Sequence, residues 1–108
     1  MCMAAIAYSV IATLPTAAAA SEYIAWLQAG HVQRVLESGA AWAGIIRIEQ
    51  PPAPLQVESR YVFPDRATFE RYLVDTAPGL RAEGLTRFPP ASGVSFERRV
   101  GTAVWVSR

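Results

Sequence analysis

The segment AWAGIIRIEQPPAPLQVESRYVF, residues 41–63, decides the fold of this 108-residue chain. Residues 41–50 and 55–63 are rich in β-branched and aromatic side chains, which is typical of β-strands. Pro51, Pro52 and Pro54 lie between them and cannot donate hydrogen bonds to a central ladder. The segment therefore predicts a β-hairpin with a stiff loop.

The second strand of this hairpin alternates between two kinds of side chain. Successive residues of a strand point to opposite faces of its sheet. One face carries Leu55, Val57, Ser59, Tyr61 and Phe63. The other face carries Gln56, Glu58, Arg60 and Val62. The sheet is thus expected to have one mostly apolar face and one mostly charged face.

A stripe of mostly apolar positions at three- and four-residue steps predicts a helix over residues 17–38, before the hairpin. The stripe consists of Ala20, Ile24, Leu27, His31 and Val35. Thr16 or Ser21 is expected to cap the start of the helix, and Gly39 to end it. Gly30 lies inside the pattern, directly before His31, and an interior glycine can mark close packing against a neighbouring backbone.

The apolar run at residues 4–14 allows two interpretations. Together with the small residues that follow, it resembles the hydrophobic region and cleavage site of a secretory signal peptide, but no Lys or Arg precedes it. It is also too short to span a bilayer. We favour a buried first strand at residues 5–13, ended by Pro15, because its removal would leave three strands with an exposed edge. A cytoplasmic location follows from this interpretation, and processing of residues 1–20 is left open.

Two short helices are predicted after the hairpin. Pro64 and Asp65 are expected to stop the strand and to cap a helix over residues 67–75. The inner side of this helix carries Phe69, Tyr72 and Leu73. Because proline is tolerated in a first turn, Pro78 is expected to begin a second helix over residues 78–88. Its candidate anchors are Leu80 and Leu85.

The last predicted strand covers residues 94–105, after a loop at residues 89–93. Gly101 within it is a candidate bulge. The element order is then strand, helix, strand, strand, helix, strand, in a single domain of residues 1–108. With right-handed crossovers this order gives the split βαβ arrangement, an antiparallel sheet with both helices on one face.

Composition narrows the classes of function. The chain is 52% hydrophobic and 18% charged, with a formal net charge of +1, so it resembles an ordinary globular domain. Without an excess of basic residues it is expected to bind neither nucleic acid nor an anionic membrane. All ten basic residues are Arg, which excludes mechanisms that need a lysine. Cys2 is the only cysteine, in a terminus expected to fray, which excludes an intramolecular disulfide and a thiolate metal cluster.

Opposite charges stand two residues apart on three predicted strands, on what is expected to be a single face. The pairs are Arg47 with Glu49, Glu58 with Arg60 and Glu97 with Arg99. One interpretation is a solvated surface, on which single pairs contribute about 0 to 1 kcal/mol. The interpretation we favour is a self-complementary interface, in which a two-fold axis brings Arg of one subunit towards Glu of the other.

Two motifs carry a resemblance to a known family. The first helix matches W-(x)4-H-[IV]-(x)2-V-L-(x)2-G at Trp26, His31, Val32, Val35, Leu36 and Gly39. Residues 77–88, APGLRAEGLTRF, match the second motif. Over nearly the whole domain the chain resembles an uncharacterised bacterial family of dimeric α/β-barrel proteins. The resemblance implies an α+β, ferredoxin-like βαββαβ monomer that dimerises through its sheet, with relatives among cofactor-independent monooxygenases, muconolactone isomerases and stress-responsive barrel proteins. It implies no particular reaction.

His31 is the only histidine, and its helical stripe is expected to face the sheet. One interpretation is a hydrogen-bonded structural residue of the core. The other is a catalytic residue that lines a pocket between helix and sheet and moves a proton or binds a substrate, since the unperturbed pKa of histidine lies near neutrality. Both interpretations stay open at this point.

Aromatic side chains from four predicted strands are candidates to line the same pocket and bind a ligand. They are Tyr8, Trp42, Tyr61 and Phe96. Rings with polar tips suit a planar organic ligand, although an ordinary core would use the same residues. Ser9 and Ser59 are candidates to add one hydroxyl each.

Arg81 is a further candidate ligand-binding residue, because an arginine can hold a carboxylate. Glu83 and Arg87, in the same motif, are expected to form an i,i+4 pair worth about 0.2–0.5 kcal/mol. The sequence holds no metal-ligand constellation and no phosphate-binding glycine loop, so we expect neither a metal nor a cofactor.

The sequence leaves two hypotheses of function. The first is a small homodimer whose helix–sheet cavity binds a small hydrophobic or aromatic metabolite; if it is an enzyme, cofactor-independent oxygenase or isomerase chemistry with His31 as acid or base is expected. The alternative is a non-catalytic interaction or dimerisation module. An open site that contains both His31 and tyrosine hydroxyls would favour the metabolite-binding homodimer. A filled interior in which His31 is bonded only to backbone atoms would favour the non-catalytic module.

Overall fold

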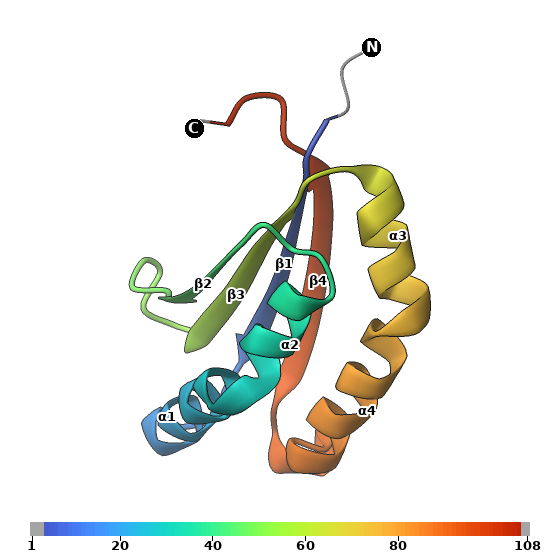
Figure 1. The fold of residues 1–108 in the computed structure, drawn as a ribbon. Helices are drawn as coiled ribbons and strands as arrows, with labels where there is room; N and C mark the ends of the chain where they lie inside the picture. The colour runs from blue at the N-terminus through green and yellow to red at the C-terminus, as the bar shows by residue number, and fades with distance from the viewer. Residues whose placement is uncertain (1–3, 107–108) are drawn as a thin grey trace.

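The computed structural model describes residues 4–106 and contains a four-stranded antiparallel sheet in the order β2-β3-β1-β4 (Figure 1). The strands are β1 (Ile6–Thr13), β2 (Trp42–Arg47), β3 (Gln56–Phe63) and β4 (Ser95–Thr102). The first of them is central, because it pairs with β3 on one side and with β4 on the other. The strand predicted at residues 5–13 is therefore confirmed, as is the α+β, ferredoxin-like fold class.

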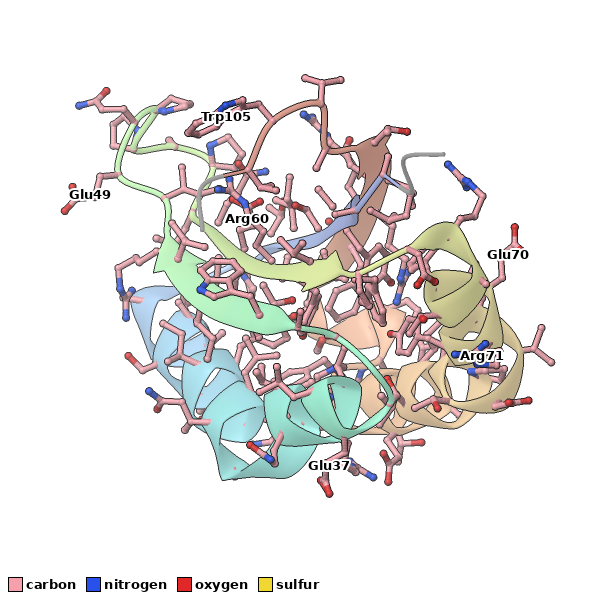
Figure 2. All side chains as sticks on the ribbon, turned by 45° about the horizontal axis from the view of Figure 1, so that its top comes forward. Glu37, Glu49, Arg60, Glu70, Arg71 and Trp105 are labelled. Atoms are coloured by element: carbon pink, nitrogen blue, oxygen red, sulfur yellow. The ribbon has the colours of Figure 1, made fainter. Side chains whose placement is uncertain are left out.

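Helices cover one face of the sheet and leave the other face bare (Figure 2). The first arm consists of α1 (Ala17–Trp26), a π-turn η1 (Leu27–His31) and α2 (Val32–Glu37). The second arm consists of α3 (Arg66–Asp75) and α4 (Ala77–Arg87). A short 3-10 turn, η2 (Pro90–Ser92), leads into β4. Because each arm contains two α-helices, the element order is βααββααβ.

The first arm departs from the single helix predicted over residues 17–38. It begins as expected, with the Ala19 N–H donating to the Thr16 hydroxyl at 3.0 Å. Gly30 then has a φ of +138°, and the Val32 N–H donates to the carbonyl of Leu27, five residues back. A Cβ at Gly30 would meet nothing within 4 Å, so the predicted close packing is wrong. Glycine stands there because the backbone turns through positive φ.

The second arm follows the prediction more closely. Asp65 caps α3 by accepting from the Thr68 N–H at 2.8 Å, and Pro78 lies in the first turn of α4. The side chain of Leu80 is buried as predicted, but Leu85 is 52% exposed and anchors nothing in the core.

Two details of the predicted strands are also wrong. Gly101 pairs with Ala7 in an unbroken register, so it forms no bulge. Arg47 pairs with Val57, which faces the helices, so the expected Arg47–Glu49 pair does not belong to the bare face.

The bare face of the sheet carries the other two predicted charge pairs. Glu58 is only 8% exposed, because the Ser9 hydroxyl donates to it at 2.8 Å and the Arg60 guanidinium at 3.1 Å. Arg99 binds Glu97 in the same way, at 2.8 Å. Figure 2 shows Arg60 and Trp105 on this side, opposite the helices. Each pair is formed along one strand, between residues two positions apart.

The core on the covered face is divided into two clusters of buried side chains. One joins Tyr8 and Phe63 of the sheet to Phe69 of the second arm. The other joins Tyr23 and Leu27 of the first arm to Phe88, along with other residues near the opposite end of the sheet. The boundary between the two clusters is where the interior is not completely filled.

Candidate functional site

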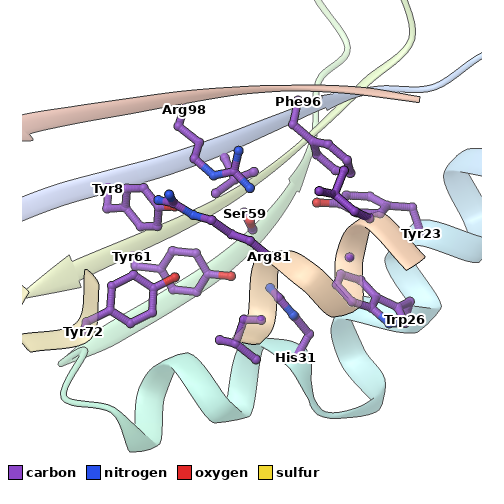
Figure 3. Close-up of a pocket in the computed structure, with 14 residues that line it drawn as sticks. Tyr8, Tyr23, Trp26, His31, Ser59, Tyr61, Tyr72, Arg81, Phe96 and Arg98 are labelled. Carbon is purple, nitrogen blue, oxygen red and sulfur yellow. The ribbon is translucent and has the colours of Figure 1, made fainter. Parts of the chain in front are cut away.

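A cavity of about 140 Å³ lies between the two helical arms and the sheet, where the two core clusters meet. Figure 3 shows Tyr61 and Tyr72 on one side of it, Tyr23 and Trp26 on the other, and His31 and Arg81 between them. The described residues that line it are Tyr8, Val10, Tyr23, Trp26, His31, Ser59, Tyr61, Tyr72, Leu80, Arg81, Gly84, Leu85, Phe96 and Arg98.

The structure brings most of the predicted site residues together. The lining includes His31, Tyr8, Tyr61, Phe96 and Arg81, which come from the first arm, three strands and the second arm. These positions share one face because Tyr8 pairs with Tyr61, while β4 places Phe96 on the covered face of the sheet opposite Ala12.

Trp42 and Ser9 do not belong to the cavity, contrary to the prediction. Trp42 pairs with Val62 on the bare face of the sheet and is 49% exposed. Ser9 also lies on that face and is bonded to Glu58. Both errors have one cause, since a side chain one position out of phase along a strand points to the opposite face.

Sequence reasoning missed several residues of the lining. Arg98 stands two residues after Phe96, so the alternation of a strand could have found it. Tyr72 had been expected on the inner side of its helix, but its contribution to a cavity depends on how the second arm packs. Tyr23 and Trp26 lie outside the apolar stripe predicted for the first arm, and no local signal places them beside His31.

The π-turn explains how Trp26 and His31 come together. In a regular α-helix, residues five positions apart point about 140° away from each other. Here the turn contains an extra residue, and the two rings stack with their centroids 4.2 Å apart. Such π-turns are often found at functional sites. The glycine that permits this turn therefore positions the only histidine at the cavity.

Three buried side-chain atoms have no hydrogen-bond partner within the part of the chain that the structure describes. They are Nδ1 of His31, the hydroxyl of Tyr61 and Nε of Arg81. All three belong to residues that line the cavity. Buried polar atoms are ordinarily bonded, since leaving one unsatisfied costs about 1–3 kcal/mol. The unsatisfied polar side-chain atoms of the described interior thus all belong to residues around this one space.

Burial keeps His31 neutral at physiological pH. Removal of its imidazole from water, reinforced by the positive charge of Arg34, lowers the pKa of His31 from 6.5 to about 4. Glu83 acts in the opposite direction, and Arg98 adds to the decrease. The imidazole is therefore uncharged and can accept a hydrogen bond, or a proton from a group acidic enough to match its lowered pKa.

Tyrosine hydroxyls of the cavity are held in their protonated form. Burial raises the pKa of Tyr61 to about 12, partly opposed by the nearby Ser59. It also raises the pKa values of Tyr23 and Tyr72 well above the ordinary value of tyrosine. These hydroxyls are therefore hydrogen-bond donors over the whole physiological range.

Ion pairs join the two arms outside the cavity. Arg34 of α2 binds Glu83 of α4 at 2.7 Å, and Arg87 of α4 lies 3.7 Å from Glu22 of α1. The predicted pair between Glu83 and Arg87 within one helix is therefore wrong. Each side chain finds a partner on the opposite arm, which local spacing cannot show.

Within residues 4–106, no three His, Cys, Asp or Glu side chains are grouped so that they could hold a metal ion. Cys2 lies outside the described residues. Across the same part of the chain, no helix has the length and apolar character needed to cross a membrane.

Similarity to known proteins is found at the level of the fold. No protein-family model and no curated protein matches the chain. A dimeric ferredoxin-like protein from an uncultured marine organism superposes with a TM-score of 0.75, at 16% identity over 96% of this chain and 99% of the other. A mutant of SnoaB, a cofactor-independent oxygenase from Streptomyces nogalater, superposes with a TM-score of 0.63, at 14% identity over 94% and 95%. A second SnoaB structure gives 0.56, at 17% identity over 95% and 96%. The chain is thus similar in fold to a dimeric ferredoxin-like protein and to a cofactor-independent oxygenase.

Proposed function

We propose that this protein is a homodimer whose cavity binds a small aromatic metabolite, and that His31 accepts a proton from it. One observation carries the proposal: the unsatisfied atoms of His31, Tyr61 and Arg81 all belong to residues that line the same cavity. A ligand with oxygen atoms would satisfy them. The alternative of a filled, non-catalytic module fits less well, because the interior is open beside His31 and its Nδ1 is bonded to no backbone atom within the described chain.

The size and lining of the cavity favour a ligand with one ring. Its volume is about 140 Å³, and an apolar cavity of about 150 Å³ in another protein holds a benzene molecule. Tyr23, Trp26 and Phe96 offer ring faces and edges for offset or edge-on contacts. A polycyclic ligand would exceed this space unless the arms moved apart.

The chemistry that the site supports is removal of a proton from an activated O–H or C–H group. The proton would move to Nδ1 of His31, and the bonding electron pair would stay on the ligand. The protonated tyrosine hydroxyls would then donate to the oxygen that gains negative charge. Isomerisation would return the proton at another carbon. Oxygenation would use O₂ as co-substrate to convert a CH₂ group of the ligand into a carbonyl, with the second oxygen atom released as water. The fold similarity to SnoaB, a cofactor-independent oxygenase, supports chemistry of this class.

Deuterium exchange tests the role of His31. The protein is incubated in heavy water with a panel of single-ring phenols and enolisable cyclic ketones, and loss of the acidic C–H signals is followed by NMR. We expect His31→Gln to slow exchange of the best ligand by about 100-fold or more, as loss of a general base does. Gln33→Ala, an exposed change on the same arm, is the matched control. Unchanged exchange in a folded His31→Gln protein would contradict the proposal.

The homodimer is supported by the bare face of the sheet. That face displays Glu58 with Arg60 and Glu97 with Arg99, an arrangement that two copies can match around a two-fold axis. The protein from the uncultured marine organism, with the same fold, is described as dimeric.

Light scattering tests the homodimer at micromolar concentration. We expect the mass of two chains, and Arg99→Glu should reduce it to that of one chain by placing like charges at the interface. Arg71→Glu makes the same charge change on an exposed helix surface and serves as control. A single-chain mass for the unmodified protein would refute dimerisation.

A further inference from the structure

Two arginines face the cavity without a carboxylate to balance them. Arg81 from α4 and Arg98 from β4 both belong to the lining (Figure 3). Among the described residues, that lining contains no Asp or Glu. Four other arginines are matched with acids, in the pairs Arg34–Glu83, Arg60–Glu58, Arg87–Glu22 and Arg99–Glu97. The lining is therefore positively charged, and the described residues that form it include no counter-ion.

The guanidinium group of Arg81 has one unsatisfied donor and one weakly bonded donor. Its Nη2 donates to the Tyr8 hydroxyl only at 3.4 Å, which is long for such a bond. Its Nε is buried and has no partner among the described residues. A carboxylate binds arginine through two parallel N–H···O bonds, which require this kind of planar edge. The geometry fits an acidic group brought by a ligand.

Arg98 adds a second positive charge on the sheet side of the same space. Its guanidinium carbon lies 5.9 Å from the centre of the Phe96 ring. The positive charge of Arg98 contributes to the lowered pKa of His31 and opposes the rise in the pKa of Tyr23. It therefore acts on residues on both sides of the cavity. An anion bound near Arg81 would therefore be stabilised by two arginines.

We propose that the ligand is a single-ring aromatic carboxylate, with its carboxylate on Arg81 and Arg98 and its ring beside Trp26 and Phe96. This inference rests on the proposed function and names the chemical class of its ligand. A planar carboxylate adds little volume to a ring, which matters in a cavity of about 140 Å³. The Tyr61 hydroxyl and His31 Nδ1 are then free to bind a second oxygen or an acidic proton of the ligand.

Calorimetric titration with benzoate and benzamide tests the charge requirement. The two probes have nearly the same shape, but only benzoate is an anion at pH 7. We expect the unmodified protein to bind benzoate about 10- to 100-fold more tightly, the range typical of a hydrogen bond to a charged group. Arg81→Gln should remove most of this preference and leave benzamide binding nearly unchanged. Arg47→Gln removes the same charge from an exposed position outside the cavity and should leave the preference intact.

The outcomes separate this inference from the proposed function. Equal affinity for both probes in the unmodified protein would overturn the carboxylate proposal while leaving an aromatic site in place. A preference for benzoate that survives in Arg81→Gln would also overturn it. Binding of neither probe would overturn both proposals. Circular dichroism and benzamide binding show whether Arg81→Gln is folded. They therefore distinguish weaker benzoate binding caused by unfolding from weaker binding caused by loss of the charge.

Discussion

The two helical arms are both interrupted in the middle, but by different residues and with different geometry. The first arm turns at Gly30, through positive φ and an extra residue in the helical turn. The second arm is interrupted at Thr76, just before Pro78, with no residue in the positive φ region. Each interruption is followed by a polar side chain that enters the cavity, His31 in one arm and Arg81 in the other.

This difference explains why one interruption was predicted from the sequence and the other was not. Proline lacks the N–H that a helix interior needs, so Pro78 indicates a helix start wherever it occurs. Glycine within a helix costs only about 1 kcal/mol relative to alanine and is compatible with an unbroken helix. One unbroken helix, with Gly30 at a point of close packing, was therefore the natural expectation, although this glycine allows the turn that brings Trp26 onto His31.

The largest expected effect comes from the leucine that each arm buries. Leu27→Ala and Leu80→Ala should each lower the free energy of unfolding by about 2–5 kcal/mol, because both side chains are almost fully buried. Leu85→Ala, in the same helix as Leu80, should change it by about 0.5 kcal/mol or less, since Leu85 is 52% exposed. Urea denaturation measures all three. If Leu85→Ala lowered the free energy of unfolding as much as Leu80→Ala does, the second arm would pack differently from the structure described here.

Glycine-to-alanine changes should have opposite signs in the two arms. Gly30→Ala forces a Cβ into positive φ and should cost about 1–3 kcal/mol of folding free energy, even though the space around it is open. Gly79→Ala lies in an ordinary helical turn of α4 with equally open space, and should stabilise the protein by about 0.4–1 kcal/mol. The urea midpoint measures both changes. Stabilisation by Gly30→Ala would be incompatible with the π-turn.

The last expected effect is a pH dependence specific to the first arm. Because the pKa of His31 is about 4 in the folded protein and 6.5 when exposed, the unfolded chain binds the proton more readily. The stabilising effect of a neutral His31 is complete above pH 6.5 and is lost as the pH falls towards 4. His31→Gln should remove this part of the decrease between pH 7 and 4.5, as measured by urea denaturation at each pH. An identical decrease in the variant would contradict the lowered pKa.

The sheet was more predictable from the sequence than the arms. Alternation along residues 55–63 correctly divided β3 into a covered and a bare face, because a period of two residues leaves little choice. The short strand β2 has apolar residues in both phases, so nothing local showed that Trp42 points away from the cavity. The partners of Glu83 and Arg87 could not be predicted either, since both lie on the opposite arm.

The stack of Trp26 on His31 gives the protein an intrinsic optical reporter. The other two tryptophans are largely exposed, Trp42 at 49% and Trp105 at 80%, so both can be replaced by phenylalanine without altering the lining. The remaining indole would then report on its neighbouring imidazole, because an imidazolium quenches indole fluorescence more strongly than neutral imidazole does. The fluorescence emission of the unlabelled protein would change when a compound enters the cavity or when the imidazole is protonated. Chemical libraries could therefore be screened by intrinsic fluorescence.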